Sequence, residues 1–298
     1  MPCAKVPRGR IHGANARKRE RPAPFACTRV ATRAFAVRSE LAVRSCHGVP
    51  RFRSIPGVEE LDLLLQSSGM TSLPPGQRLI AEFPRFGVVS FAKRRLSSME
   101  VRLEVTGPLA RAVVLTATEL AQLPRASVTA DFHCAAGWSY RSLCWTGVRF
   151  RDVWDTFIRP TVQPGDTLGF AVLRCQDGYR TALPLADLLA PDVVIADRFD
   201  DRPLTVEHGA PIRLIAPAHY GYKSAKHLVA IELRHDAEGY RPLLPRLLDH
   251  PRARVEFEER GQLLPGWLLR YAFRPFIQPI IRDLKRISAE ARSRFPGT

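Results

Sequence analysis

Residues 131–150 read DFHCAAGWSYRSLCWTGVRF and bring one histidine, two cysteines and two tryptophans into twenty positions. Cysteine is sparse elsewhere, so a thiol at Cys134, beside a histidine and just before a Gly-Trp-Ser turn, is unusual for this chain. Taken alone, the stretch is compatible with a buried structural thiol, a nucleophile, a zinc site or a thiolate bound to another metal. The rest of the chain has to decide among these four.

The positive charge of the chain lies mainly at its two ends. The 298 residues carry a net charge of +16, of which residues 1–53 supply +11 and residues 241–298 supply +6, which leaves −1 for residues 54–240. A nucleic-acid-binding protein usually carries its positive charge on the folded domain. We therefore do not expect nucleic acid as a partner.

These shifts in charge divide the chain into three expected regions. Residues 1–53 read as a disordered basic leader or as an open reading frame begun too far upstream. Residues 54–240 read as the folded domain, and residues 241–298 as a basic extension packed on that domain, on a partner or on a membrane surface. We expect a cytoplasmic protein with reduced cysteines, because the sequence has no apolar run of transmembrane length, no secretory signal and no Cys-x-x-Cys pair.

Hydrophobic patterns predict an α+β fold, with strands and short helices joined by irregular loops. The predicted strands cover 101–105, 126–134, 166–175, 192–204, 210–222 and 226–235. The predicted short helices cover 57–69, 116–124, 150–158 and 183–191. We expect residues 71–91 to form a loop over the surface or a ligand, and the tryptophan-rich part of 131–150 to be a loop as well.

Zinc is disfavoured at Cys134, and a nucleophilic role stays open. A structural zinc site needs four ligands, yet Cys134 and Cys144 are ten residues apart with no second pair. A cysteine nucleophile needs a partner imidazole, which His208, His219 or His227 could provide. The sequence around Cys134 matches no local signature of a cysteine hydrolase.

A second stretch, EHGAPIRLIAPAHYGYKSAKHLVAIEL at 207–233, is typical of an anion site. Arg213 offers a planar fork for phosphate oxygens, and the loop at 221–226 adds lysines and a serine hydroxyl. The spacing is not that of a Walker loop. A thiolate and a phosphate site in one domain together suggest a metal held by cysteine and by a phosphorylated organic ligand.

The two stretches together resemble the molybdopterin-dependent oxidoreductases of the sulfite oxidase superfamily. The likeness is to bacterial sulfite-oxidase-like proteins and the catalytic subunit of methionine-sulfoxide reductase, and it spans residues 70–240. The resemblance implies a sulfite-oxidase-type domain of mixed β-sheets with a Mo-molybdopterin cofactor, one molybdenum per chain. It also implies two-electron oxygen-atom transfer on a small sulfur- or nitrogen-oxide substrate, with a separate haem or flavin protein as electron partner.

The resemblance also assigns residues. The catalytic residue and molybdenum ligand falls on Cys134. The cofactor contacts fall on Phe83, Pro84, Arg85, Asp177, His208, Arg213, Ser224, Ala225 and Lys226.

One departure from the family pattern bears on the substrate. Ala135 and Ala136 follow the cysteine where sulfite oxidases carry an Arg-bearing stretch, and no arginine occurs before Arg141. The Trp-Ser that comes next is similar to the reductase branch, which puts sulfite as substrate in doubt. The competing hypothesis is a cofactor-free basic binding protein whose tails contact membrane or nucleic acid.

Overall fold

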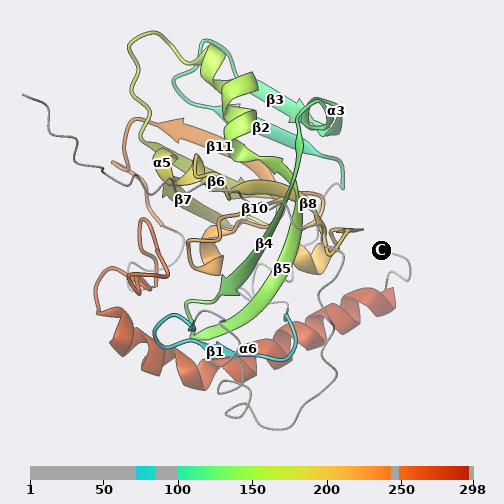
Figure 1. Ribbon diagram of the computed structural model, residues 1–298, viewed down its shortest axis with the longest axis vertical. Helices are drawn as coiled ribbons and strands as arrows, with labels where there is room; N and C mark the ends of the chain where they lie inside the picture. Colours follow the sequence, from blue (N-terminus) through green and yellow to red (C-terminus); the bar gives the residue numbers. More distant parts are fainter. Residues whose placement is uncertain (1–71, 85–98, 243–247, 295–298) are drawn as a thin grey trace, which may run out of the picture. The chain divides into compact units, whose positions relative to one another are not determined.

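The computed structural model describes residues 72–84, 99–242 and 248–294. All described residues belong to one compact unit of the chain, which spans Val43–Thr298. They form two β-sheets with short helices between the strands and one long helix near the C-terminus (Figure 1). The predicted α+β class with mixed sheets is therefore confirmed.

The first sheet carries the cysteine stretch at its centre. Its strands follow the order β1-β5-β8-β10, with β4 paired to β5 and β9 paired to β8. Antiparallel β4 and β5 form a long hairpin, visible in Figure 1. The strands are β1 Arg78–Leu79, β4 Arg125–His133, β5 Trp138–Arg149, β8 Val194–Phe199, β9 Arg202–Pro203 and β10 Arg213–Ile215.

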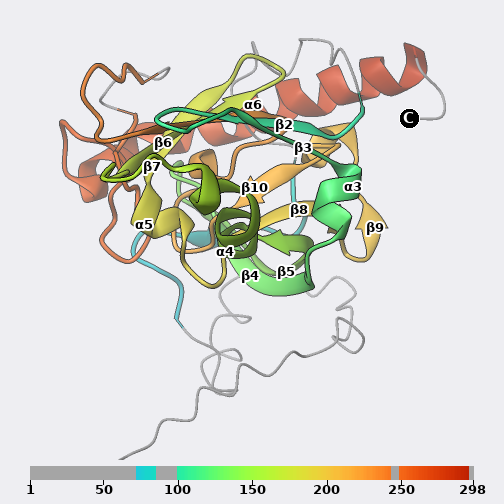
Figure 2. The ribbon, with the colours of Figure 1, turned by 90° about the horizontal axis from the view of Figure 1, so that it is seen from above.

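The second sheet has the order β3-β2-β11-β6-β7. Its one parallel pair joins β2 to β11 across more than a hundred residues of sequence, and its other pairs are antiparallel. Figure 2 shows these strands with β8 and β10 of the first sheet beyond them. The strands are β2 Arg102–Thr106, β3 Val113–Thr116, β6 Phe170–Cys175, β7 Arg180–Pro184 and β11 Leu228–Arg234.

Strands β8 and β10 of the first sheet are buried on both faces, and their successive residues point alternately into two different cores. Ile195 of β8 and Leu214 of β10 belong to the main core, together with the apolar residues of the second sheet. Their neighbours Ala196 and Ile215 point the other way, into a second core that includes Trp145 of β5. This second core lies on the same side of the first sheet as the aromatic residues around the cysteine hairpin.

The helices apart from the last are short. Thr116 caps α3, since its side chain accepts from the Thr118 amide while the Glu119 carboxylate accepts from the Thr116 amide. The helical segments are α3 Ala117–Ala121, α4 Phe150–Val153, the π-helix Trp154–Ile158, α5 Leu185–Leu188, the 3-10 turns Arg159–Thr161, Val206–His208 and Gly221–Lys223, and α6 Gly266–Arg294.

The structure corrects the expected loop in 131–150. Residues 138–149 form β5, a central strand rather than a loop, and β7 had not been predicted at all. The C-terminal helix α6 continues through Pro275 and Pro279. The helix predicted at 57–69 lies outside the described residues, and no helix in the described ranges is both long and apolar enough to cross a bilayer.

The crossing of β5 and β8 at Gly147 generates a stability prediction. The register of the two strands shifts here, and a Cβ on Gly147 would lie 2.0 Å from the Ile195 carbonyl oxygen. Gly147→Ala should therefore force the central strands apart and lower the free energy of unfolding by about 2–3 kcal/mol. Urea unfolding followed by circular dichroism measures the change.

Gly165→Ala is the matched control for Gly147→Ala. Gly165 has a φ of +88°, but a Cβ there meets nothing within 4 Å. It should cost only about 1–2 kcal/mol of backbone strain. Equal losses in the two variants would contradict the close packing at Gly147.

Candidate functional site

Cys134 lies in the tight turn that joins β4 to β5. The Cys134 amide donates to the Trp138 carbonyl at 2.8 Å, and the Gly137 amide donates to the Cys134 carbonyl at 2.9 Å. Gly137 has a φ of +102°, and a Cβ there would approach the Gly76 carbonyl oxygen to 3.1 Å. The turn therefore requires glycine at this position, and it holds the thiol at the end of a rigid hairpin.

The Cys134 thiol is buried, with 8% of the residue exposed. Its Sγ accepts the Ala136 amide at 3.4 Å. Burial raises the pKa of the thiol to about 12, against small opposing effects of that amide and of Arg260. An activated cysteine nucleophile shows the opposite shift, so the nucleophile hypothesis is disfavoured.

A chain of buried hydrogen bonds supports the turn from behind. Gln77 Nε2 donates to the Cys134 carbonyl at 3.2 Å, and Ser139 Oγ donates to Gln77 Oε1 at 3.0 Å. His133 Nδ1 lies 2.8 Å from the same Ser139 oxygen. Because the single hydroxyl proton is already used toward Gln77, the imidazole must donate from Nδ1. Burial lowers the pKa of His133, so this histidine acts as a neutral support rather than a catalytic acid.

Arg260 fixes the other side of the turn from far along the chain. Its residue surface is fully buried, and its guanidinium donates to the carbonyls of Ala135 and Pro75. The guanidinium also pairs with Glu258 and lies 5.0 Å from the centre of the Tyr220 ring. Neither Arg260 nor Gln77 was identified from the sequence.

The His208–Arg213 segment is folded tightly against residues 224–226. Gly209 has a φ of +107°, and a Cβ there would lie 3.1 Å from Lys226 Cβ and 3.2 Å from Arg213 Cβ. The next peptide bond, Ala210–Pro211, is cis. The absence of a side chain at Gly209 thus brings together two of the sequence-predicted site segments.

Arg213 is a fully buried cation. Its Nη1 donates to the His208 carbonyl at 2.8 Å and its Nη2 to the Ser224 carbonyl at 3.0 Å. Its guanidinium carbon lies 4.8 Å from the centre of the Trp145 ring. The Nε atom has no hydrogen-bond partner, and no carboxylate of the described residues pairs with the guanidinium. Burial lowers the pKa of Arg213 to about 9, so an anionic ligand would relieve an unfavourable environment.

Residues 224–226 take different roles within one short segment. Ser224 Oγ accepts the Ala216 amide at 3.2 Å, and Ala225 is buried. Lys226 Nζ donates to the Glu207 carbonyl at 2.8 Å, which holds the lysine beside His208. Of these three residues, Ser224 contacts the Arg213 guanidinium directly, through its carbonyl oxygen.

Lys223 does not have the anion-binding role that the sequence suggested for the lysines of residues 221–226. Its Nζ is buried and donates to Asp249 at 3.3 Å and to the Ala182 carbonyl at 2.9 Å. It is therefore a structural ion pair and not a phosphate ligand. The physical reason is its acidic partner, which lies 26 residues further along the chain.

Phe83 connects the two halves of the site. Its ring stacks on His208 at 5.4 Å with an interplanar angle of 15°, and it meets Phe132 of the cysteine hairpin at 5.2 Å. Pro84 is buried next to it, whereas Arg85 lies outside the described residues. The structure thus brings Phe83 into contact with His208, while its role as a cofactor contact stays a prediction.

Asp177 lies in the turn between β6 and β7. Its Oδ1 accepts the Tyr179 amide at 2.9 Å, so its carboxylate stabilises its own turn. The neighbouring Gln176 amide donates to the His227 carbonyl at 2.9 Å, which places this turn against the segment that follows Lys226. Asp177 is thus brought near the site, but its described contact is local.

Two further observations concern cysteine and metal chemistry. Cys134 and Cys175 are free buried thiols, whereas Cys144 is disulfide-bonded, which does not fit the expectation of reduced cysteines throughout. Within the described ranges, no group of three or more His, Cys, Asp or Glu side chains could hold a metal. A metal at Cys134 would therefore depend on an organic ligand for its other donors, and the buried cation at Arg213 fits an anionic group on such a ligand.

The comparisons with known proteins agree with this arrangement. The family model of the oxidoreductase molybdopterin binding domain matches residues 91–240, which include Cys134, His208, Arg213 and 224–226. The match ends before Arg260.

Similar proteins share this segment. The uncharacterized oxidoreductase YuiH of Bacillus subtilis (strain 168) is 32% identical over 169 residues, which cover 56% of this chain and 81% of the relative. The protein-methionine-sulfoxide reductase catalytic subunit MsrP of Xanthomonas campestris pv. campestris is 28% identical, with coverages of 48% and 52%. The mitochondrial sulfite oxidase of Drosophila melanogaster is 29% identical, with coverages of 44% and 27%. The chain thus spans about half of the reductase subunit and a smaller share of the sulfite oxidase.

The raised pKa of Cys134 predicts a pH profile for its alkylation. Only the thiolate reacts with iodoacetamide, so labelling of metal-free protein should increase about tenfold per pH unit from pH 8 to pH 11 without a plateau. Peptide mass spectrometry isolates Cys134 from the other cysteines. Free glutathione, whose labelling levels off near pH 9, is the control. A plateau near neutral pH would indicate an activated nucleophile instead.

Proposed function

The chain belongs to the oxidoreductase molybdopterin-binding domain family, and on that premise we propose that Cys134 is its thiolate ligand to molybdenum. The protein is an oxidoreductase related to sulfite oxidase and to the methionine-sulfoxide reductase catalytic subunit. The observation that carries the proposal is the free buried thiol of Cys134, held at the end of the β4–β5 hairpin, in one fold with a buried arginine that lacks a carboxylate partner among the described residues. A phosphorylated pterin that also holds a metal answers both requirements.

Different residues of the anion site would bind different parts of the pterin. The Arg213 Nε–H is the donor available for a phosphate oxygen, and Lys226 adds a second positive charge beside it. His208 and Phe83 present stacked rings, a surface suited to a flat heterocycle. These contacts would fix the orientation of the pterin relative to Cys134, because the Phe83 cluster joins the two halves of the site.

When bound, the molybdenum cofactor supplies two-electron oxygen-atom transfer. The protein holds the thiolate position rigid through Gln77, Ser139 and Arg260, and it excludes water from Sγ by burial. The small side chains of Ala135 and Ala136 stand where sulfite oxidases carry a cationic stretch. We therefore propose a small sulfur- or nitrogen-oxide substrate other than sulfite.

Turnover requires an electron partner. Two-electron oxygen-atom transfer would need a donor or acceptor for the two electrons, and we propose a separate haem or flavin protein in this role. The name of the reductase relative, a catalytic subunit, supports a divided arrangement of this kind. The cytoplasmic location stays a prediction.

The proposal predicts a molybdenum content that depends on Cys134. Protein purified from a molybdenum-replete host should carry about one molybdenum per chain. Cys134→Ala should lose it, because no cluster of other metal-binding side chains in the described ranges could replace the thiolate. Metal analysis by mass spectrometry on folded protein measures the content.

Cys175→Ala is the matched control. Cys175 is also a free thiol, and 6% of the residue is exposed against 8% for Cys134. This variant should keep its molybdenum. Wild-type protein without molybdenum or pterin would overturn the proposed function and favour a cofactor-free basic binding protein.

A second prediction concerns Arg213. Arg213→Lys keeps a positive charge but removes the guanidinium fork, and a charged hydrogen bond contributes about 1.5–3 kcal/mol. Pterin retention should fall about tenfold or more, measured as the fluorescent oxidised pterin released per chain. Arg125→Lys, which alters an exposed arginine paired with Asp197, should leave retention unchanged. Full retention in Arg213→Lys would contradict the anion site.

A further inference from the structure

Helix α6 packs on the protein by one stripe of side chains. Leu269 and Leu284 are fully buried, and Phe273, Ile277 and Ile280 between them are partly buried at the spacing of one helix face. Salt bridges attach both halves of the helix, from Arg270 to Glu258 at 3.6 Å and from Lys285 to Glu82 at 3.1 Å. The orientation of the helix is therefore set by contacts along its length.

The opposite stripe of α6 faces away from these contacts. Leu268, Tyr271, Pro275, Arg282 and Arg286 follow one another at intervals of three, four or seven residues, and all are exposed. At about 1.5 Å per residue, this stripe extends over roughly 27 Å. It is apolar toward the N-terminal end of the helix and cationic toward the other end.

Exposed hydrophobic side chains are concentrated at the apolar end. Of the nine large hydrophobic residues that the described ranges expose, seven lie between 257 and 276. We call the six of them between 257 and 271 the aromatic patch: Phe257, Leu263, Leu264, Trp267, Leu268 and Tyr271. Phe276 lies on another side of α6, because nine helical residues separate it from Trp267. The segment that carries Phe257 lies against the start of α6. A Cβ on Gly266 would be 2.0 Å from the carbonyl oxygen of Glu258, the residue after Phe257.

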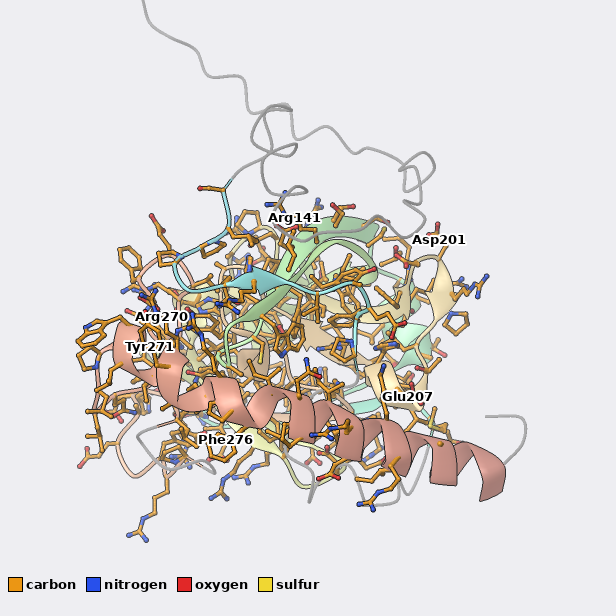
Figure 3. All side chains as sticks on the ribbon, turned by 90° about the horizontal axis from the view of Figure 1, so that it is seen from below. Arg141, Asp201, Glu207, Arg270, Tyr271 and Phe276 are labelled. Atoms are coloured by element: carbon orange, nitrogen blue, oxygen red, sulfur yellow. The ribbon has the colours of Figure 1, made fainter. Side chains whose placement is uncertain are left out.

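Arginines accompany the rings of the patch. The Arg254 guanidinium lies 4.1 Å from the centre of the Phe257 ring, and those of Arg270 and Arg274 lie 5.2 Å and 4.6 Å from Tyr271. Figure 3 shows Arg270 and Tyr271 together at the N-terminal end of α6, with Phe276 further along the helix.

The acidic side chains near the patch leave its charge positive. Glu258 is paired with Arg260 and Arg270, Glu259 with Arg254, and Asp283 with Arg286, while Glu256 beside Phe257 is exposed. Helix α6 itself carries seven basic and two acidic residues. The complementary surface must therefore be apolar beneath an anionic layer.

We propose that the aromatic patch and the cationic stripe of α6 dock the protein on an anionic phospholipid surface. Trp and Tyr favour the interfacial layer of a bilayer, where their rings reach the acyl chains while arginines meet the phosphates. The exposed stripe of α6 is apolar at one end and cationic at the other, and a bilayer surface offers acyl chains and anionic phosphates to both ends at once. The proposal is independent of the cofactor chemistry, because none of its residues belongs to the site.

Trp267 provides a built-in reporter for the test. The chain has four tryptophans, of which Trp138 and Trp145 are buried, Trp154 is packed against the core and Trp267 is 54% exposed. Full-length protein is titrated with phosphatidylcholine vesicles that contain or lack phosphatidylglycerol. With the anionic vesicles we expect co-sedimentation, a blue shift of the emission and quenching by brominated acyl chains, all weakened by high salt.

The variants separate insertion of the patch from simple attraction of the basic N-terminal region. Trp267→Phe should keep binding but lose the spectral change. Leu268→Ser combined with Tyr271→Ser should weaken binding about tenfold or more. Met99→Ser, which changes an exposed hydrophobic residue outside the patch, is the matched control and should bind like the wild type.

Three outcomes would overturn the proposal. They are binding without a blue shift of Trp267, equal binding by the double variant and the wild type, and no binding to anionic vesicles. Patch-dependent self-association in sedimentation velocity without vesicle binding would instead assign the patch to a second copy of the chain. Molybdenum content, measured in parallel, should be unchanged in these variants.

Discussion

The buried guanidinium of Arg213 is the constraint around which the site is organised. A cation without exposed surface is unfavourable unless its donors are satisfied and its charge is balanced. The carbonyls of His208 and Ser224 satisfy the two terminal nitrogens, and the Trp145 ring lies close to the guanidinium. The close approach at Gly209 brings the His208 and Ser224 segments together around the arginine. The hydrogen bonds of the guanidinium are thereby largely satisfied, and an anionic ligand would balance its positive charge.

Cys134, at the other end of the site, is a buried group whose negative form would be favoured by a cation. Its thiol, with a pKa of about 12, is neutral at physiological pH in the absence of metal, so it can be buried at little electrostatic cost. A cationic metal would favour the thiolate, just as an anion would favour the arginine. The two buried groups thus match opposite charges on one ligand, and the stacked rings of Phe83 and His208 lie between the segments that carry them.

The sequence predicted those parts of the molecule that depend on local patterns. β2 and β11 were found because apolar and polar residues alternate there, and Cys134, His208 and Arg213 were found as short motifs. β5 was missed because it is buried on both faces and bordered by glycines, so its pattern resembles a turn-rich loop. Arg260 left no local signal, since it bonds to a backbone carbonyl 125 residues away that any residue type provides.

The exposure of the aromatic patch follows from how the C-terminal segment is anchored. Arg260 is fully buried against the cysteine turn, yet Trp267 is more than half exposed seven residues later. Glu258 pairs with both Arg260 and Arg270, and its carbonyl fills the space beside Gly266, which fixes the direction in which α6 leaves the anchor. Turning the patch inward would require breaking the ion pair of a buried arginine, which is costly because it would leave a buried charge without its partner. The patch is therefore held outward by the same contacts that hold Cys134 in place.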